Sequence, residues 1–174
     1  RDSVLFARSG FVSLLDEVED AGARDIIIVA HSMGAFLTME GLRQMVLKDG
    51  PHALDHIKGV VLIAPELDLD VFRAQAEDIG RLPEPFVIFG SSRDRVLNIS
   101  ATLSGTGDRL GNIDSVEKIA DLNVIYLDTA AYSTGTGHLN IGENPALLKL
   151  FGGLVGIADA FTADARARVG LLPG

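Results

Sequence analysis

Hydrophobic positions along the first part of the chain follow two different periods. Residues 3–21 and 33–48 carry apolar side chains three or four positions apart, which predicts two helices. Residues 26–30 between them read Ile-Ile-Ile-Val-Ala, a run that is apolar on both faces. A run of this kind is typical of a buried parallel strand. Gly22 is the predicted C-cap of the first helix.

The same alternation continues to the end of the chain. Further strands are expected at residues 57–64, 86–89 and 124–127, and further helices at 69–80, 114–120 and 144–161. Strands that alternate with helices predict an α/β fold, with a mostly parallel sheet that has helices on both faces. We expect residues 1–174 to form a single domain whose last residues, 162–174, are a loosely held tail.

A serine follows the first predicted strand. The segment Ala30-His31-Ser32-Met33-Gly34 joins that strand directly to a helix. This is the sequence form of a nucleophile elbow, a strand-to-helix turn that lifts a serine hydroxyl above the sheet. The serine backbone is strained there, so we expect small residues two positions before and after it. The alternative interpretation makes Ser32 an ordinary turn residue.

Two further polar residues follow later strands. Asp94 comes after the third strand, and His138 lies in the loop after the fourth. The carboxyl ends of parallel strands share one edge of the sheet, where functional groups gather. A serine needs an imidazole to take its proton, and the imidazole needs a carboxylate to orient it. The pattern therefore predicts Ser32 as nucleophile, His138 as base and Asp94 as acid, with the backbone N–H of Met33 as an oxyanion donor.

Each of these assignments has an alternative. The alternative interpretation makes Asp94 a helix N-cap or a charged residue in a solvated loop. Asp128, at the end of the fourth strand, is the next candidate for the acid. His138 has the alternative of being an ordinary loop histidine.

The other histidines are weaker candidates for the base. The side chain of His31 is expected to point away from that of Ser32, which favours a supporting role. His52 and His56 flank Pro51 in a predicted surface connection, away from the strand ends.

Three carboxylates alternate after the second strand, at Glu66, Asp68 and Asp70. In an extended segment they would share one face, which is one way to bind a hard cation. The favoured interpretation is that Asp68 or Asp70 caps the following helix. A third alternative is that one of the carboxylates lines the mouth of the site. We predict neither a metal nor a cofactor.

Composition and charge narrow the class of protein. Hydrophobic residues make up 47% of the chain, which indicates a folded domain. The formal charge of −9 disfavours nucleic acid as a partner, because binding it requires a basic face. The chain has no cysteine, and its apolar runs are too short to cross a bilayer.

Taken together, these motifs resemble the α/β-hydrolase superfamily. More narrowly, they resemble a bacterial family of α/β-hydrolases of unknown function, usually described as esterase- or lipase-like. The resemblance covers about residues 1–155, and its matching segments are 30–34, 62–72, 91–97, Gly137-His138 and Asn144-Pro145. It implies the same roles for Ser32, Asp94 and His138.

The chain departs from the family pattern in two respects. Ala35 stands where the family normally has an asparagine. The first strands of the family, and the His-Gly loop that supplies an oxyanion donor, have no counterpart in this sequence. We therefore expect a chain that corresponds to the C-terminal two-thirds of the domain. We also expect another chain, or a missing N-terminal segment, to complete its sheet.

The resemblance implies hydrolysis of esters through an acyl-enzyme. The connection 65–85 is too short for a large lid, which favours small or medium substrates. Two alternatives remain: a non-catalytic binding or scaffolding domain on the same fold, and acyl transfer to an acceptor other than water. A fluorophosphonate probe separates the first alternative from an enzyme, because it labels an activated serine alone.

Overall fold

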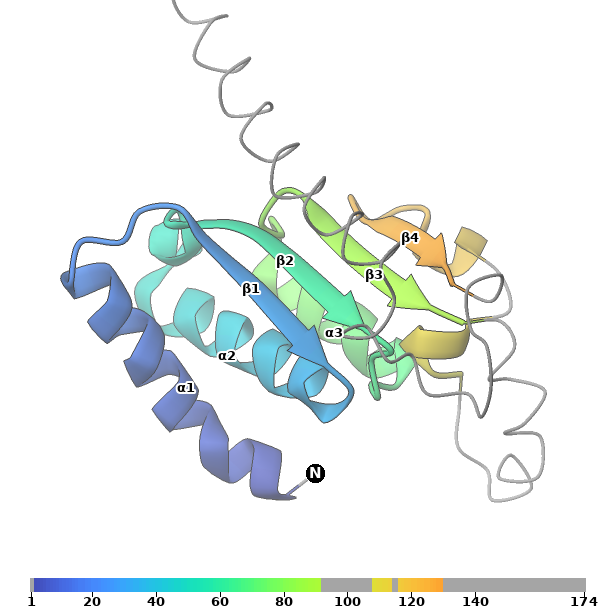
Figure 1. Ribbon diagram of the computed structural model, residues 1–174, viewed down its shortest axis with the longest axis horizontal. Coiled ribbons are helices and arrows are strands. Elements are labelled where there is room, and N and C mark those ends of the chain that lie inside the picture. Colours follow the sequence, from blue (N-terminus) through green and yellow to red (C-terminus); the bar gives the residue numbers. More distant parts are fainter. Residues whose placement is uncertain (1, 92–107, 114–115, 130–174) are drawn as a thin grey trace, which may run out of the picture. The chain divides into compact units, whose positions relative to one another are not determined.

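Among the residues that the structure describes, four parallel strands form one sheet in the order β1-β2-β3-β4 (Figure 1). The strands are β1 (Ile26–His31), β2 (Ile57–Ile63), β3 (Phe86–Gly90) and β4 (Ile125–Asp128). The computed structural model describes residues 2–91, 108–113 and 116–129, and these belong to one compact unit within residues 1–137. The four predicted strands are confirmed, with ends that differ from the prediction by one residue.

In the described part of the chain, three α-helices accompany the sheet, with short 3₁₀ helices in the connections. They are α1 (Asp2–Asp20), α2 (Met33–Asp49), α3 (Leu69–Ile79), η1 (Pro51–Leu54), η2 (Leu110–Asn112) and η3 (Val116–Ile119). Gly22 follows α1 with a φ of 100°, as the C-cap prediction requires. The predicted helix at 144–161 and the tail at 162–174 lie outside the described residues. Within the described part of the chain, no helix has the length and hydropathy that a membrane span needs.

The core lies between the sheet and the helices α2 and α3, which cover the same sheet face (Figure 1). The strand register places Ala30 beside Leu62 and Leu62 beside Ile88, so that these side chains share one face. All three are buried in the core cluster together with Met39 and Phe72 of the helices. Each large apolar side chain that is fully buried stabilises the fold by about 1.5–3 kcal/mol.

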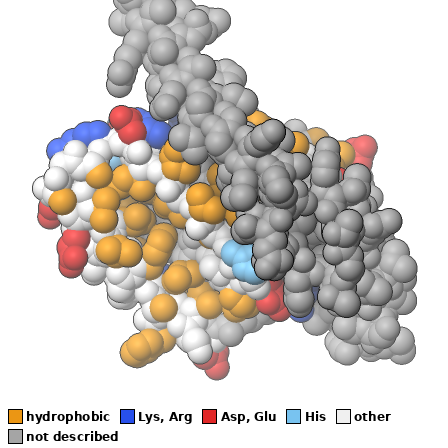
Figure 2. Space-filling view, viewed as in Figure 1, with side chains coloured by type: hydrophobic (Ala, Val, Ile, Leu, Met, Phe, Trp, Pro, Cys, Tyr) orange, Lys and Arg blue, Asp and Glu red, His pale blue; other side chains and the backbone are white. Residues whose placement is uncertain are grey.

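The other face of the sheet is buried in its centre and exposed at β1. Val29 is aligned with Val61, and Val61 with Val87, on this face. Val61 and Val87 are buried, whereas Val29 is 57% exposed. Figure 2 shows hydrophobic side chains gathered on this face over β1. Among the described strands, β1 is an edge strand, although its sequence is apolar on both faces.

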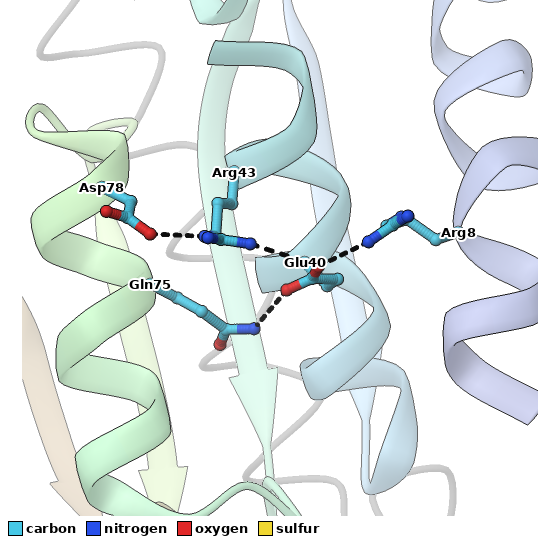
Figure 3. Close-up of polar contacts among 5 residues, drawn as sticks. All are labelled: Arg8, Glu40, Arg43, Gln75 and Asp78. Carbon is cyan, nitrogen blue, oxygen red and sulfur yellow. Dashed lines mark hydrogen bonds and ion pairs between the residues drawn. The ribbon is translucent and has the colours of Figure 1, made fainter. Parts of the chain in front are cut away.

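A carboxylate joins the three helices to one another (Figure 3). Glu40 of α2 is 7% exposed. It accepts hydrogen bonds from Arg8 Nη1 of α1 at 2.7 Å and from Gln75 Nε2 of α3 at 3.0 Å. Arg43 of α2 contacts Glu40 at 3.5 Å and also Asp78 of α3 at 2.5 Å. These contacts join α1 to α2 and α2 to α3.

The connection between α2 and β2 differs from the sequence prediction. His52 is exposed and pairs with Asp55, as a surface connection requires. His56 is buried instead, and its Nδ1 lies 3.3 Å from Glu19 Oε2 of α1. The prediction that His56 lies in a surface connection was wrong, because Ile26 N–H donates to the His56 carbonyl and the start of β2 lies beside β1. Both histidines lie before the amino end of β2, away from Ser32.

Candidate active site

Ser32 forms the turn between β1, which ends at His31, and α2, which begins at Met33. Its φ of 54° and ψ of −121° are rare for a residue with a side chain. The Ser32 N–H donates to the Ile63 carbonyl at 3.0 Å, and its carbonyl accepts from Ala35 and Glu66 N–H, both at 3.1 Å. The neighbouring strand and the start of α2 therefore hold the strained turn in place.

The side chain of Ser32 is not used to cap the helix. Ser32 occupies the N-cap position of α2, yet its hydroxyl makes no capping hydrogen bond. The first N–H groups of a helix have no acceptor within the helix, and they form its positive end. Donors at Met33 and Gly34 therefore lie at the same turn as the serine hydroxyl. Serine is common at the start of helices because its hydroxyl caps the first N–H groups, and this reason does not explain Ser32.

Small residues flank the turn on both sides. A Cβ added to Gly34 would lie 3.8 Å from the Cβ of Ala30, an ordinary van der Waals contact. The two positions therefore face each other, and a methyl group at each fills the space between them. This agrees with the prediction that both positions are small, and it shows room for one methyl group at Gly34.

The chain turns sharply again after β2. Ala64 has a φ of 42°, and its N–H donates to the Phe89 carbonyl at 2.8 Å. The turn directs Glu66 toward Ser32, whose Oγ donates to Glu66 Oε2 at 3.4 Å. Of the three carboxylates of the acidic segment, Glu66 is therefore the one that contacts Ser32.

Asp68 has the other role that the sequence suggested. Its side chain accepts hydrogen bonds from the N–H groups of Asp70 and Val71 at 3.0 and 3.3 Å, and so caps α3. This confirms the capping interpretation. The described ranges contain no group of three or more His, Asp or Glu side chains arranged to hold a metal ion.

A short returning segment lies against the end of β2. Leu69 N–H donates to the Asp108 carbonyl, and Leu110 N–H donates to the Leu67 carbonyl, both at 2.8 Å. A Cβ on Gly111 would come within 2.8 Å of the Pro65 carbonyl oxygen, so the close approach requires glycine. This pairing fixes the backbone on both sides of Arg109.

Arg109 is a site residue that the sequence reasoning missed. Its Nη1 lies 2.8 Å from Glu66 Oε1, and both side chains are a little under half exposed. Ser32, Glu66 and Arg109 therefore form a continuous series of polar contacts. The acidic motif identified Glu66 as a candidate, but no local pattern relates it to a residue 43 positions away.

The other strand ends reach the same edge of the sheet. Ser91 follows β3 and is buried, and the N–H and hydroxyl of Thr129 after β4 both donate to the Gly90 carbonyl at 2.8 Å. Asp128, the alternative acid, is the last residue of β4 and is exposed. Asp94 and His138 lie outside the described residues, so their roles remain predictions.

The neighbouring histidine lies apart from the core. His31 is the last residue of β1, and its side chain is exposed, as is that of Val29 two residues before it. Ile28 and Ala30, which alternate with Val29 and His31 along β1, are buried under the helices. His31 therefore belongs to the sheet face that α2 and α3 leave open.

A parallel sheet whose first described strand turns through a strained serine into a helix defines the α/β-hydrolase class. The family described as "Alpha/beta hydrolase of unknown function (DUF900)" matches residues 1–152, and the chain belongs to this family. The resemblance inferred from the sequence motifs is thereby confirmed. No curated protein and no solved structure matches the chain.

Proposed function

We propose that this α/β-hydrolase is a serine hydrolase that acts on carboxylic esters. Ser32 is the nucleophile, His138 the general base and Asp94 the acid that orients His138. The Met33 N–H is one donor of the oxyanion hole. The observation that carries the proposal is the backbone of Ser32, which holds a φ of 54° while its hydroxyl is left out of helix capping. Strain of this kind persists where the surrounding structure maintains it, and it clusters at active sites.

The reaction follows from these roles. Ser32 Oγ attacks the ester carbonyl carbon while His138 takes the hydroxyl proton. The carbonyl oxygen becomes an oxyanion, which the Met33 N–H stabilises at the positive end of α2. The alcohol leaves with the proton that His138 returns to it, and an acyl-serine remains. Water then attacks the acyl group, passes a proton to His138 and releases the acid and the free Ser32 hydroxyl.

We infer small or medium acyl groups as substrates. The connection from β2 to β3 contains one helix of 11 residues, α3, and its first residue is tied to Asp108 by a backbone hydrogen bond. A cover of this size encloses little of a long lipid chain. Short p-nitrophenyl esters are therefore the appropriate first substrates.

The test uses the complete protein with p-nitrophenyl acetate and butyrate, without added metal. We expect Ser32→Ala to lower kcat/KM by about 1,000-fold or more, because the members of a triad act as a unit. A fluorophosphonate probe is expected to label the wild type and not the variant. Ser13→Ala is the matched control, since Ser13 is exposed on α1 and its replacement removes an equivalent hydroxyl.

Two results would contradict the proposal. The first is Ser32→Ala with the activity of the wild type. The second is loss of activity on adding a chelator while Ser32→Ala remains active, which would indicate metal-dependent chemistry. Thermal unfolding of the variants, followed by circular dichroism, verifies that each one is folded.

A further inference from the structure

The carboxylate of Glu66 is held between the nucleophile and a cation. One oxygen, Oε2, accepts from Ser32 Oγ at 3.4 Å, and the other, Oε1, accepts from Arg109 Nη1 at 2.8 Å. The backbone N–H of Glu66 also donates to the Ser32 carbonyl at 3.1 Å. Backbone pairing on both sides of Arg109 fixes the backbone that carries the guanidinium beside this segment. These contacts place the negative charge of Glu66 beside Ser32.

The distance between Glu66 and Ser32 limits how far from Glu66 the base that deprotonates Ser32 can lie. A base that takes the serine proton must come within about 2.6–3.2 Å of Oγ. Since Oγ is 3.4 Å from Glu66 Oε2, the cation of that base forms within about 6–7 Å of the carboxylate. An opposite charge at about this distance favours the charged form of a titrating group.

The charges around Glu66 are few among the residues that the structure describes. Arg109 is its one cationic contact, and Ser32 its one neutral contact. Asp68 turns away to cap α3, and Asp108 pairs with Lys118. Among these described residues, the electrostatic effect of Glu66 at Ser32 is therefore set mainly by the carboxylate itself and by the guanidinium that partly neutralises it.

We propose that Glu66 stabilises the cation of the base that deprotonates Ser32, and that Arg109 limits this effect by pairing with the same carboxylate. The inference rests on the proposed function, because it requires a base that acts on Ser32. It assigns opposite roles to two residues that touch each other. A purely structural role for the pair would give the two residues the same role, since breaking the contact from either side removes the same bond.

The test compares Glu66→Gln and Arg109→Gln in the complete protein, by the pH dependence of kcat/KM for p-nitrophenyl butyrate. Glu66→Gln keeps an oxygen that can accept from Ser32 and removes the charge. We expect it to lower the midpoint of the acidic limb by about 0.5–1 pH unit. Arg109→Gln leaves the carboxylate unpaired, and we expect it to raise that midpoint by up to about 0.5 unit. Both shifts are expected to shrink in about 1 M salt, because the pair is partly exposed.

Asp70→Asn is the matched control. It removes a carboxylate four residues further along, in the first turn of α3, and we expect it to leave the midpoint unchanged. Midpoints that stay at the wild-type value in both Gln variants, or that move in the same direction, overturn the inference. If Ser32→Ala abolishes activity in that case, the proposed function stands and only the inference about Glu66 and Arg109 fails. If Ser32→Ala stays active, the proposed function and this inference both fail.

Discussion

Gly90, the last residue of β3, lies against the hydroxyl end of Tyr126 from the neighbouring strand. A Cβ at this position would lie 1.8 Å from the Tyr126 hydroxyl oxygen and 2.7 Å from the Gly111 carbonyl oxygen. Burial, together with the Asp128 carboxylate, raises the pKa of Tyr126 to about 12, so the phenol stays neutral at ordinary pH. Gly34, at the turn after Ser32, differs because an added Cβ meets one methyl group at 3.8 Å.

We therefore predict opposite results for the same substitution at the two glycines. Gly90→Ala forces the sheet edge apart, and we expect it to lower the free energy of unfolding by about 1–3 kcal/mol. Gly34→Ala replaces a helical glycine without a clash, and we expect the stability to stay the same or rise by up to about 1 kcal/mol. Urea unfolding of both variants measures the difference, and equal losses would contradict the packing at Gly90.

At the scale of elements, the three helices are joined by polar contacts as well as by the core. Phe11 of α1 packs over Gly41 of α2, where an added Cβ would lie 2.5 Å from the ring. Beside this close contact, Glu40 bonds to α1 through Arg8 and to α3 through Gln75 (Figure 3). A buried carboxylate is costly unless it is paired and hydrogen-bonded, and Glu40 meets both conditions.

Removing the charge of Glu40 tests its contribution. We expect Glu40→Gln to lower the free energy of unfolding by about 1–3 kcal/mol, because the guanidinium groups of Arg8 and Arg43 lose their negative partner and the bond from Gln75 becomes a neutral one. Lys48→Ala, which breaks an exposed ion pair with Asp49, is the control and should change stability by less than about 0.5 kcal/mol. The measurement is again urea unfolding. A change for Glu40→Gln no larger than that of the control would mean that the charge of Glu40 contributes nothing to stability.

At the scale of the whole molecule, apolar side chains are exposed on β1 and α1. Val29 is 57% exposed on β1, and Phe6 of α1 is 91% exposed, with Leu14 also largely exposed. Edge strands are normally short, charged or interrupted, because an apolar edge invites pairing with another chain. We propose that another strand or chain covers this region of β1.

This proposal predicts the behaviour of residues 1–174 expressed alone. We expect that span to associate or to be poorly soluble, since side chains such as Val29 each gain about 1.5–3 kcal/mol from burial. Val29→Lys is expected to reduce the association, whereas Ser13→Lys adds the same charge on an exposed helix position and should not. Sedimentation velocity measures both. A monomeric span with a cooperative thermal transition would contradict the prediction.

Most of the elements could be predicted from the sequence, because their signals are local. The alternation of apolar runs identified the four strands and the helices α1, α2 and α3, and the small residues around Ser32 identified the turn between β1 and α2. The capping of α3 by Asp68 was also recognisable, since a cap depends on residues two and three positions away. Of the predicted triad, Ser32 alone lies within the described residues.

The sequence by itself determined the elements, the family and the strained serine at a strand end, because backbone preferences and periodicity act between near neighbours. Only the tertiary structure decided that His56 is buried and that Val29 is exposed, since both depend on which element lies opposite. It also decided that Arg109 meets Glu66 beside Ser32. That contact depends on a chain return across 43 positions, which no local pattern encodes.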